Sequence, residues 1–199
     1  MKHIVYAIGR EFGSGGREIG QKLAAELGIQ CYDSRLIEQA SKDGGIDTDV
    51  LRQVEEKRAS GMAYASYYAY SPDTRGYGMP MNDTLFNLQT EVIFKLATKE
   101  SCVIIGRCAD DVLSDMKEAV SVFVFADLDA RIKRIMERYK VDEKLAKGMI
   151  KKYDKQRRNY YNYYTDKEWG KRNSYDMCLS SSRLGIDQCV KILKAMAEE

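Results

Sequence analysis

The run Ile4-Val-Tyr-Ala-Ile8 continues directly into Gly9-Arg-Glu-Phe-Gly13-Ser-Gly15-Gly16-Arg17-Glu18, and this stretch decides the fold. Five apolar residues in a row predict a strand that is buried on both faces. The glycines that follow let backbone N–H groups turn inward around an anion, because no Cβ stands in the way. The stretch therefore predicts a nucleotide site on a strand, turn and helix. An ordinary glycine-rich turn is the alternative, and the rest of the chain has to decide between them.

The helix after the turn is predicted over Glu18–Leu27, with Gly28 ending it. Its apolar residues recur at the spacing of one buried helix face: Ile19, Leu23, Ala24 and Leu27. A phosphate at the start of this helix would meet unpaired N–H donors and the positive end of the helix dipole together. The predicted phosphate-binding residues are Gly13, Ser14, Gly15, Gly16, Arg17 and Glu18.

The glycine motif has no lysine, although the standard phosphate-binding loop reads G-x-x-x-x-G-K-[ST]. One alignment puts Gly16 at the lysine position, and a shift by one residue puts Arg17 there and Glu18 at the position that binds magnesium. Arg17 carries a permanent charge, but its planar fork does not duplicate a lysine ammonium. Our hypotheses are that Arg17 replaces the lysine and that Ser14 supplies a hydroxyl on the metal side.

Composition limits the class of protein. A chain of 199 residues with 44% apolar content is enough for one substantial core, so we expect a single domain over 1–199. Lysine and arginine exceed aspartate and glutamate by only 32 to 30, which gives no support for a general nucleic-acid binder. With a single histidine, a zinc site is not expected.

Cysteine usage and hydropathy bear on the compartment. Five scattered cysteines without a C-x-x-C pair predict reduced thiols rather than a disulfide framework. The chain enters a strand almost at once, without a basic and then apolar leader, and no window approaches the ~18 apolar residues of a membrane span. We therefore expect a cytoplasmic protein that does not bind a membrane.

Apolar runs alternate with amphipathic stretches along the rest of the chain. The predicted strands are 28–32 (the weakest), 102–105, 120–126 and 175–179, and the predicted helices are 84–99, 129–139, 143–161 and 186–197. Strands that alternate with helices predict a parallel α/β sheet, in which ligands bind at the carboxyl ends of the strands. The glycine loop falls at that edge.

Two segments break this alternation. Ser60–Asn82 contains five tyrosines and both prolines, and it is predicted to be a mobile insert whose rings stack on a base, pack on the protein or contact a second subunit. Lys151–Arg172 mixes cations with aromatics, which fits either an RNA-binding surface or a solvated helix whose tyrosines turn inward.

Taken together, four places in the chain resemble the cytidylate kinase family of P-loop nucleoside monophosphate kinases, and more closely its divergent cytidylate kinase-like branch. They are Gly9–Glu18, Tyr32–Arg35, Ile105–Arg107 and Asp154–Arg158, and their order and spacing carry the likeness. The resemblance implies a three-layer α/β/α P-loop fold with a central parallel sheet. It also implies an acceptor-binding insert over about 35–83 and a mobile, lid-like helical segment over about 135–172.

The resemblance assigns the acceptor site first. Asp33 and Ser34 match the family's Asp-Ser pair at the monophosphate site, where Ser34 would bond the acceptor nucleotide. Gln39 stands where the family has an arginine, unless Arg35 replaces that clamp on the acceptor phosphate. Arg107 matches the arginine of the family's Gly-Arg-Asp sequence and would also hold the acceptor.

The Asp of that Gly-Arg-Asp sequence is replaced by Cys108, which leaves Asp110 or Asp111 as nearby carboxylates. The lid region supplies the remaining matches. Asp154 and Arg157 match an Asp and an Arg three residues apart, in a region where arginines reach the transferring phosphate, and Arg158 is placed beside them. Arg131 and Arg134 fit the arginines that begin the lid.

The activity that the resemblance implies is transfer of the γ-phosphoryl group of ATP, with Mg²⁺, to a nucleoside monophosphate, and CMP or dCMP are the favoured acceptors. We carry Arg17, Asp154, Arg157 and Arg158 as the expected catalytic residues. A nucleotide-binding regulatory protein without catalysis is the first alternative, because the lysine is missing. An RNA-binding protein is the second. The sequence leaves both a monomer and a homodimer open.

Overall fold

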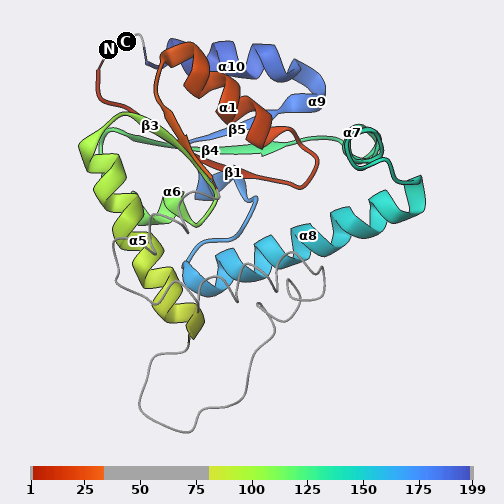
Figure 1. The fold of residues 1–199 in the computed structure, drawn as a ribbon, viewed down its shortest axis with the longest axis horizontal. Coiled ribbons are helices and arrows are strands. Elements are labelled where there is room, and N and C mark those ends of the chain that lie inside the picture. Colours follow the sequence, from red (N-terminus) through yellow and green to blue (C-terminus); the bar gives the residue numbers. More distant parts are fainter. Residues whose placement is uncertain (1, 34–80, 198–199) are drawn as a thin grey trace, which may run out of the picture. The chain divides into compact units, whose positions relative to one another are not determined.

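The computed structural model describes residues 2–33 and 81–197, with the side chains of 81–85 excepted (Figure 1). Five strands form one parallel sheet in the order β2-β3-β1-β4-β5. Their bounds are β1 Val5–Arg10, β2 Gln30–Tyr32, β3 Cys102–Ile105, β4 Ala119–Phe125 and β5 Met177–Ser180. The order reverses at β1, which pairs with β3 on one side and β4 on the other. The loop after β1 therefore lies at the switch point, where parallel sheets bind ligands.

Helices cover the sheet and connect its strands. The described helices are α1 Gly16–Leu27, α5 Met81–Lys99, α6 Ala109–Val112, α7 Leu128–Tyr139, α8 Glu143–Tyr164, α9 Ser181–Leu184 and α10 Ile186–Ala195, with a 3₁₀ turn at Arg172–Ser174. Helices α1 and α10 pack against each other over one face of the sheet (Figure 1). The predicted α/β fold with a central parallel sheet is confirmed.

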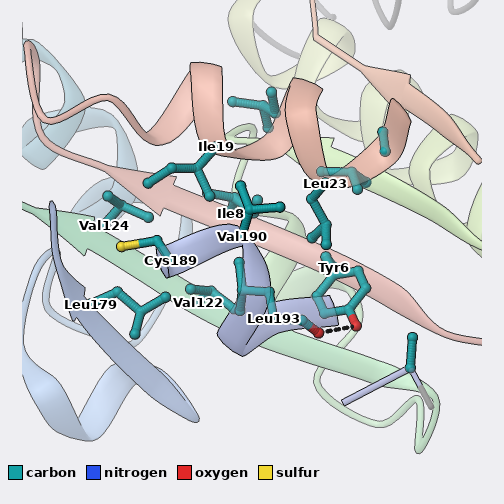
Figure 2. Packing of buried hydrophobic residues seen from close by; sticks show 14 of the residues in the cluster. Tyr6, Ile8, Ile19, Leu23, Val122, Val124, Leu179, Cys189, Val190 and Leu193 are labelled. Carbon is teal, nitrogen blue, oxygen red and sulfur yellow. Dashed lines mark hydrogen bonds between the residues drawn. The ribbon is translucent and has the colours of Figure 1, made fainter. Parts of the chain in front are cut away.

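The core under α1 and α10 is formed almost entirely by apolar side chains. Figure 2 shows alternate residues of β1 and β4 packed among apolar residues of the two helices. The central polar atom is the hydroxyl of Tyr6, which donates to the carbonyl of Leu193 at 2.7 Å, so the ring is buried without an unpaired oxygen (Figure 2). Burial without ionisable partners raises the pKa of Tyr6 to about 12. This core holds the start of α1, and with it the glycine loop, in place.

A second apolar cluster joins α7 to α8. It consists of Ile132, Ile135, Ala146 and Ile150, and Phe12 of the loop after β1 packs against it. The apolar faces of α7 and α8 thus pack against each other rather than against the sheet. The carboxylate of Asp142 begins α8 by accepting from the amide of Leu145 at 2.7 Å.

Contacts divide the chain into two units, residues 1–33 with 96–199 and residues 34–95. The first unit contains the whole described sheet. The predicted tyrosine-rich insert and most of the predicted acceptor-binding segment lie outside the described residues. The expectation of a single domain with this insert and a lid-like segment stays a prediction.

Predicted and observed elements agree closely in the first unit. The four stronger strands occur within two residues of their predicted starts and ends, and even the weak run at 28–32 supplies β2. Helix α8 continues three residues beyond the predicted end, to Tyr164. The five cysteines are all free. None of the helices over residues 2–33 and 81–197 combines the length and apolar composition needed to cross a membrane.

Candidate functional site

The loop between β1 and α1 has the backbone shape that its glycines predict. Gly13 and Gly15 have φ angles of 82° and 84°, in the left-handed region where a side chain is strained. Gly15 directly precedes α1, and no side chain of the described residues caps the start of that helix. The first N–H groups of α1 therefore lie at a site suited to an anion.

Arg134 of α7 lies directly over this loop. An alanine Cβ at Gly15 would overlap Nη1 of Arg134 and would lie 2.5 Å from Cδ1 of Ile186. The same nitrogen pairs with Oε2 of Glu18, in the first turn of α1, at 3.2 Å. Glycine is thus needed at position 15 for both its φ angle and the close approach of a guanidinium.

Ser14 faces inward rather than toward the loop opening. Its side chain is fully buried, and its hydroxyl donates to the carbonyl of Glu11 at 3.0 Å. Its own carbonyl accepts a hydrogen bond from the hydroxyl of Ser181, at the start of α9. Both contacts fix the curvature of the loop.

Arg17 and Asp33 are brought together across the site. Nε of Arg17 lies 2.9 Å from Oδ2 of Asp33, which follows β2, and the two side chains are 48% and 28% exposed. The sequence predicts these residues for different halves of the site, the donor phosphates and the acceptor. The structure brings these two side chains into contact, and their assignment to donor and acceptor stays a prediction.

The end of β3 is crowded and strained. Gly106, Arg107 and Cys108 have φ angles of 77°, 61° and 55°, so two non-glycine residues in succession take the left-handed conformation. The guanidinium of Arg10 lies against Gly106, where a Cβ would overlap it. Arg157 of α8 donates to the carbonyl of Arg10 at 3.0 Å. The predicted Arg157 thus lies near the end of β1, and the predicted Arg107 follows the glycine that Arg10 contacts.

Three ionic groups meet at Phe12. Its amide donates to Oδ1 of Asp154 at 2.8 Å, and its carbonyl accepts from Nε of Arg131 at 2.8 Å. Arg131 also pairs with Asp154 and, at 3.1 Å, with Glu11. Burial raises the pKa of Glu11, while its hydrogen bond from the amide of Ala126 and the charge of Arg131 lower it in part.

Arg157 and Arg158 differ in their surroundings although they are adjacent. The guanidinium of Arg157 lies 5.6 Å from the centre of the Phe12 ring, and that of Arg158 lies 5.6 Å from the ring centre of Trp169. The side chain of Arg157 therefore contacts the glycine loop. Arg158 is exposed and lies toward the segment that follows α8.

The two carboxylates near Cys108 have different partners. Asp110 is buried and accepts a hydrogen bond from the hydroxyl of Tyr161, on α8, at 2.6 Å; burial raises its pKa, and this hydrogen bond lowers it in part. Asp111 pairs with Lys167 at 3.3 Å. Burial also raises the pKa of the Cys108 thiol. Asp110 thus fastens α8 to α6, the short helix after β3.

Metal ligands are sparse. The described part of the chain has no cluster of three His, Cys, Asp or Glu side chains that could hold an ion by itself. Mg²⁺ in phosphotransferases usually takes most of its ligands from phosphates and water, with one or two protein oxygens. The hydroxyl of Ser14 is buried and donates to the carbonyl of Glu11, and its role on the metal side stays a prediction. The carboxylate of Glu18 fits better, since it is 53% exposed at the start of α1.

Several contacts of the site are missed by sequence reasoning. Arg10 and Phe12 lie inside the glycine motif but are not singled out by it, and Ser181 belongs to no motif. The contacts of all three depend on elements far apart in the chain. Arg134 is predicted only as a lid arginine, whereas it lies over Gly15. The predicted acceptor residues Ser34 and Arg35, and Gln39 beside them, lie outside the described residues.

Comparison with solved structures supports this fold. An uncharacterized protein from Eubacterium ventriosum ATCC 27560 has a TM-score of 0.75 and 32% identity, with 98% of this chain and 99% of that one covered. TT1252 from Thermus thermophilus has a TM-score of 0.58 and 15% identity, covering 98% and 96%. Shikimate kinase from Bacteroides thetaiotaomicron has a TM-score of 0.52 and 15% identity, covering 98% and 99%. The last two show the fold alone.

No curated protein is significantly similar to the chain. The model of the cytidylate kinase-like family, however, matches residues 5–183, which include the glycine loop, the sheet and both helices that carry the arginines. The chain therefore belongs to the cytidylate kinase-like family.

Proposed function

We propose that this protein is a phosphotransferase that moves the γ-phosphoryl group of Mg-ATP to a nucleoside monophosphate, with CMP or dCMP favoured as acceptor. Membership of the cytidylate kinase-like family supports a kinase-type enzyme that uses ATP. The acceptor rests on the resemblance alone. The observation that carries the proposal is the glycine loop at the uncapped start of α1, with guanidinium groups beside it.

The donor site would consist of the loop and the cations next to it. Backbone N–H groups after Gly15 would bind phosphate oxygens, and Arg17 and Arg134 would supply the positive charge that a lysine usually gives. Phosphoryl transfer spreads negative charge over oxygens and asks mainly for positioning and positive charge. Two guanidinium groups from different elements can meet both needs without a lysine.

Magnesium, when bound, would neutralise part of the negative charge of the ATP phosphates. Among the loop residues, Glu18 has the carboxylate best exposed to hold it, directly or through water. Arg157 of α8, whose guanidinium reaches the end of β1, would contact the transferring phosphoryl group. Arg158 would share that task once a substrate is bound. Asp33, Ser34, Arg35 and Arg107 are assigned to the acceptor.

The test is ³¹P NMR of the purified protein with Mg-ATP and each nucleoside monophosphate in turn. We expect a new diphosphate signal with CMP or dCMP. ATP that stays unchanged with every monophosphate would refute the kinase proposal. A binding titration with ATP would then identify the first alternative, a nucleotide-binding regulator without catalysis.

A matched pair of variants ties the activity to the loop. Arg17 and Lys22 lie on the same helix, are 48% and 49% exposed, and each pairs with one aspartate, Asp33 and Asp187. Only Arg17 adjoins the loop. Arg17→Ala should abolish most of the turnover, whereas Lys22→Ala should leave it unchanged.

A further inference from the structure

The backbone of Phe12 forms hydrogen bonds with side chains of α7 and α8, two helices that lie far from it in the sequence. Its amide donates to Asp154 of α8 and its carbonyl accepts from Arg131 of α7, each at 2.8 Å. Asp154 and Arg131 pair with each other as well. One peptide segment of the glycine loop is thus closed into a ring of charge-assisted hydrogen bonds, which are stronger than neutral ones.

The side chain of Phe12 is held by the same helices. Its ring centre lies 4.4 Å from that of Tyr153 on α8 and 6.0 Å from that of Tyr139 at the end of α7. The guanidinium of Arg157 lies 5.6 Å from the same ring. Residues 153, 154 and 157 share one face of α8, because positions three and four apart are neighbours on a helix.

Arg131 is committed to this role. Its side chain is only 7% exposed and has three acceptors around it: Phe12, Asp154 and Glu11. A buried guanidinium that lost one of these partners would be left with unsatisfied donors, which is costly. Both oxygens of Asp154 are likewise used, one by the Phe12 amide and one by Arg131. Each nitrogen of Arg131 and each carboxylate oxygen of Asp154 is thus already engaged within the protein.

We propose that Phe12 is a positioning residue that couples the shape of the glycine loop to helices α7 and α8, with Arg131 and Asp154 acting through its peptide. The coupling rests on the proposed function in so far as the loop binds ATP. Under this proposal Asp154 positions the loop, whereas the resemblance implies a catalytic role for it. It also means that a shift of this part of α8 changes the loop, and that an occupied loop holds α8 still.

The first experiment needs no nucleotide. Amide hydrogen exchange, followed by NMR on the full chain, is compared for the wild type, Asp154→Ala and the control Asp142→Ala. Asp142 caps the start of the same helix through the amide of Leu145. We expect exchange at Phe12 to accelerate about tenfold or more in Asp154→Ala and to stay unchanged in Asp142→Ala. Unchanged exchange at Phe12 in Asp154→Ala would overturn the proposal.

The second experiment adds a non-hydrolysable ATP analogue with Mg²⁺. In the wild type, binding should slow exchange in the loop and also around residues 150–157 of α8, and Asp154→Ala should lose the effect on α8. Protection confined to the loop would refute the coupling and leave the proposed function standing. If the analogue does not bind, the proposed function fails. The exchange rate of the Phe12 amide without nucleotide still tests whether Asp154 holds the loop.

Two further variants guard against a folding defect in Asp154→Ala. Phe12→Leu keeps an apolar side chain but removes the ring contacts, and it should raise the KM for ATP several-fold more than it lowers kcat, because loop shape affects binding first. Arg131→Lys keeps the charge but cannot reach three acceptors at once, so it should not restore wild-type binding. Full binding in Arg131→Lys would show that charge alone suffices and would overturn the positioning role.

Discussion

Replacing Tyr161 with phenylalanine removes one buried hydroxyl and keeps the ring, so the change removes the hydrogen bond to Asp110 together with the contact of the same hydroxyl with Tyr175. The two residues are 4% and 7% exposed, and the oxygens lie 2.6 Å apart. A hydrogen bond to a charged group contributes roughly 1.5–3 kcal/mol, and water cannot easily replace it at this depth. We expect Tyr161→Phe to lower the free energy of unfolding by about 2 kcal/mol at pH 7.

The loss should shrink in acid. Burial raises the pKa of Asp110, and Tyr161 lowers it in part. A carboxyl group whose pKa is raised in the folded state stabilises that state most below its unfolded pKa, where the group is protonated. This stabilisation is lost as pH rises through the folded pKa. Tyr161→Phe removes a lowering interaction, so the folded pKa rises further. The stability of the variant should therefore fall more steeply than that of the wild type between about pH 4 and 7.

Urea unfolding at both ends of this pH range measures the effect, with Tyr163→Phe as the control. Tyr163 lies on the same helix but is 72% exposed, so its variant should stay within about 0.5 kcal/mol of the wild type at either pH. A loss from Tyr161→Phe that is equal at the two pH values would refute the argument that an ionised Asp110 is its origin. A loss below about 0.5 kcal/mol at pH 7 would refute the hydrogen bond itself.

Three further outcomes follow from the site and the core. Arg17→Ala should slow turnover by about 10²-fold, the scale of one lost transition-state donor, in the same ³¹P assay and against Lys22→Ala. Gly15→Ala forces a Cβ into the left-handed region and into Arg134, so calorimetry should show ATP affinity reduced roughly tenfold or more; unchanged affinity would exclude Arg134 from the phosphate site. Burial raises the pKa of the Cys102 thiol to about 12, so a thiol reagent at pH 8 should modify it about 10²-fold more slowly in the native than in the unfolded protein.

Much of the fold could be predicted because strong apolar periodicity decides long elements. The runs that form β1, β3 and β4 contain no polar residue apart from Ser121 and, at the end of β1, Arg10, and they pair directly in the sheet. Helices α6 and α9 were missed because four residues are too few for any periodicity to register. Their existence follows from what surrounds them, such as the hydrogen bond from Ser181 to the glycine loop.

The candidate site could be predicted only where chemistry is local. The glycines at 13 and 15 have the positive φ angles that their positions indicate. The direction of a side chain is different, because it depends on partners that the sequence does not pair. Ser14 has the right hydroxyl for a metal, yet the carbonyl of Glu11 turns it inward. Asp154 is matched only to the lid region by the sequence, and its contacts with Phe12 and Arg131 require the packing of α7 on α8.

The ion pairs at the loop opening suggest how a site without lysine keeps its cations ready. Arg17 pairs with Asp33 and Arg134 with Glu18, and all four side chains are at least 28% exposed. Exposed pairs of this kind contribute only about 0–1 kcal/mol each, so a phosphate can replace the carboxylates at little cost. The buried pair of Arg131 and Asp154 differs, since breaking it would strand a charge. Exposure thus divides the arginines into those that can turn to a phosphate and one that holds the loop in shape.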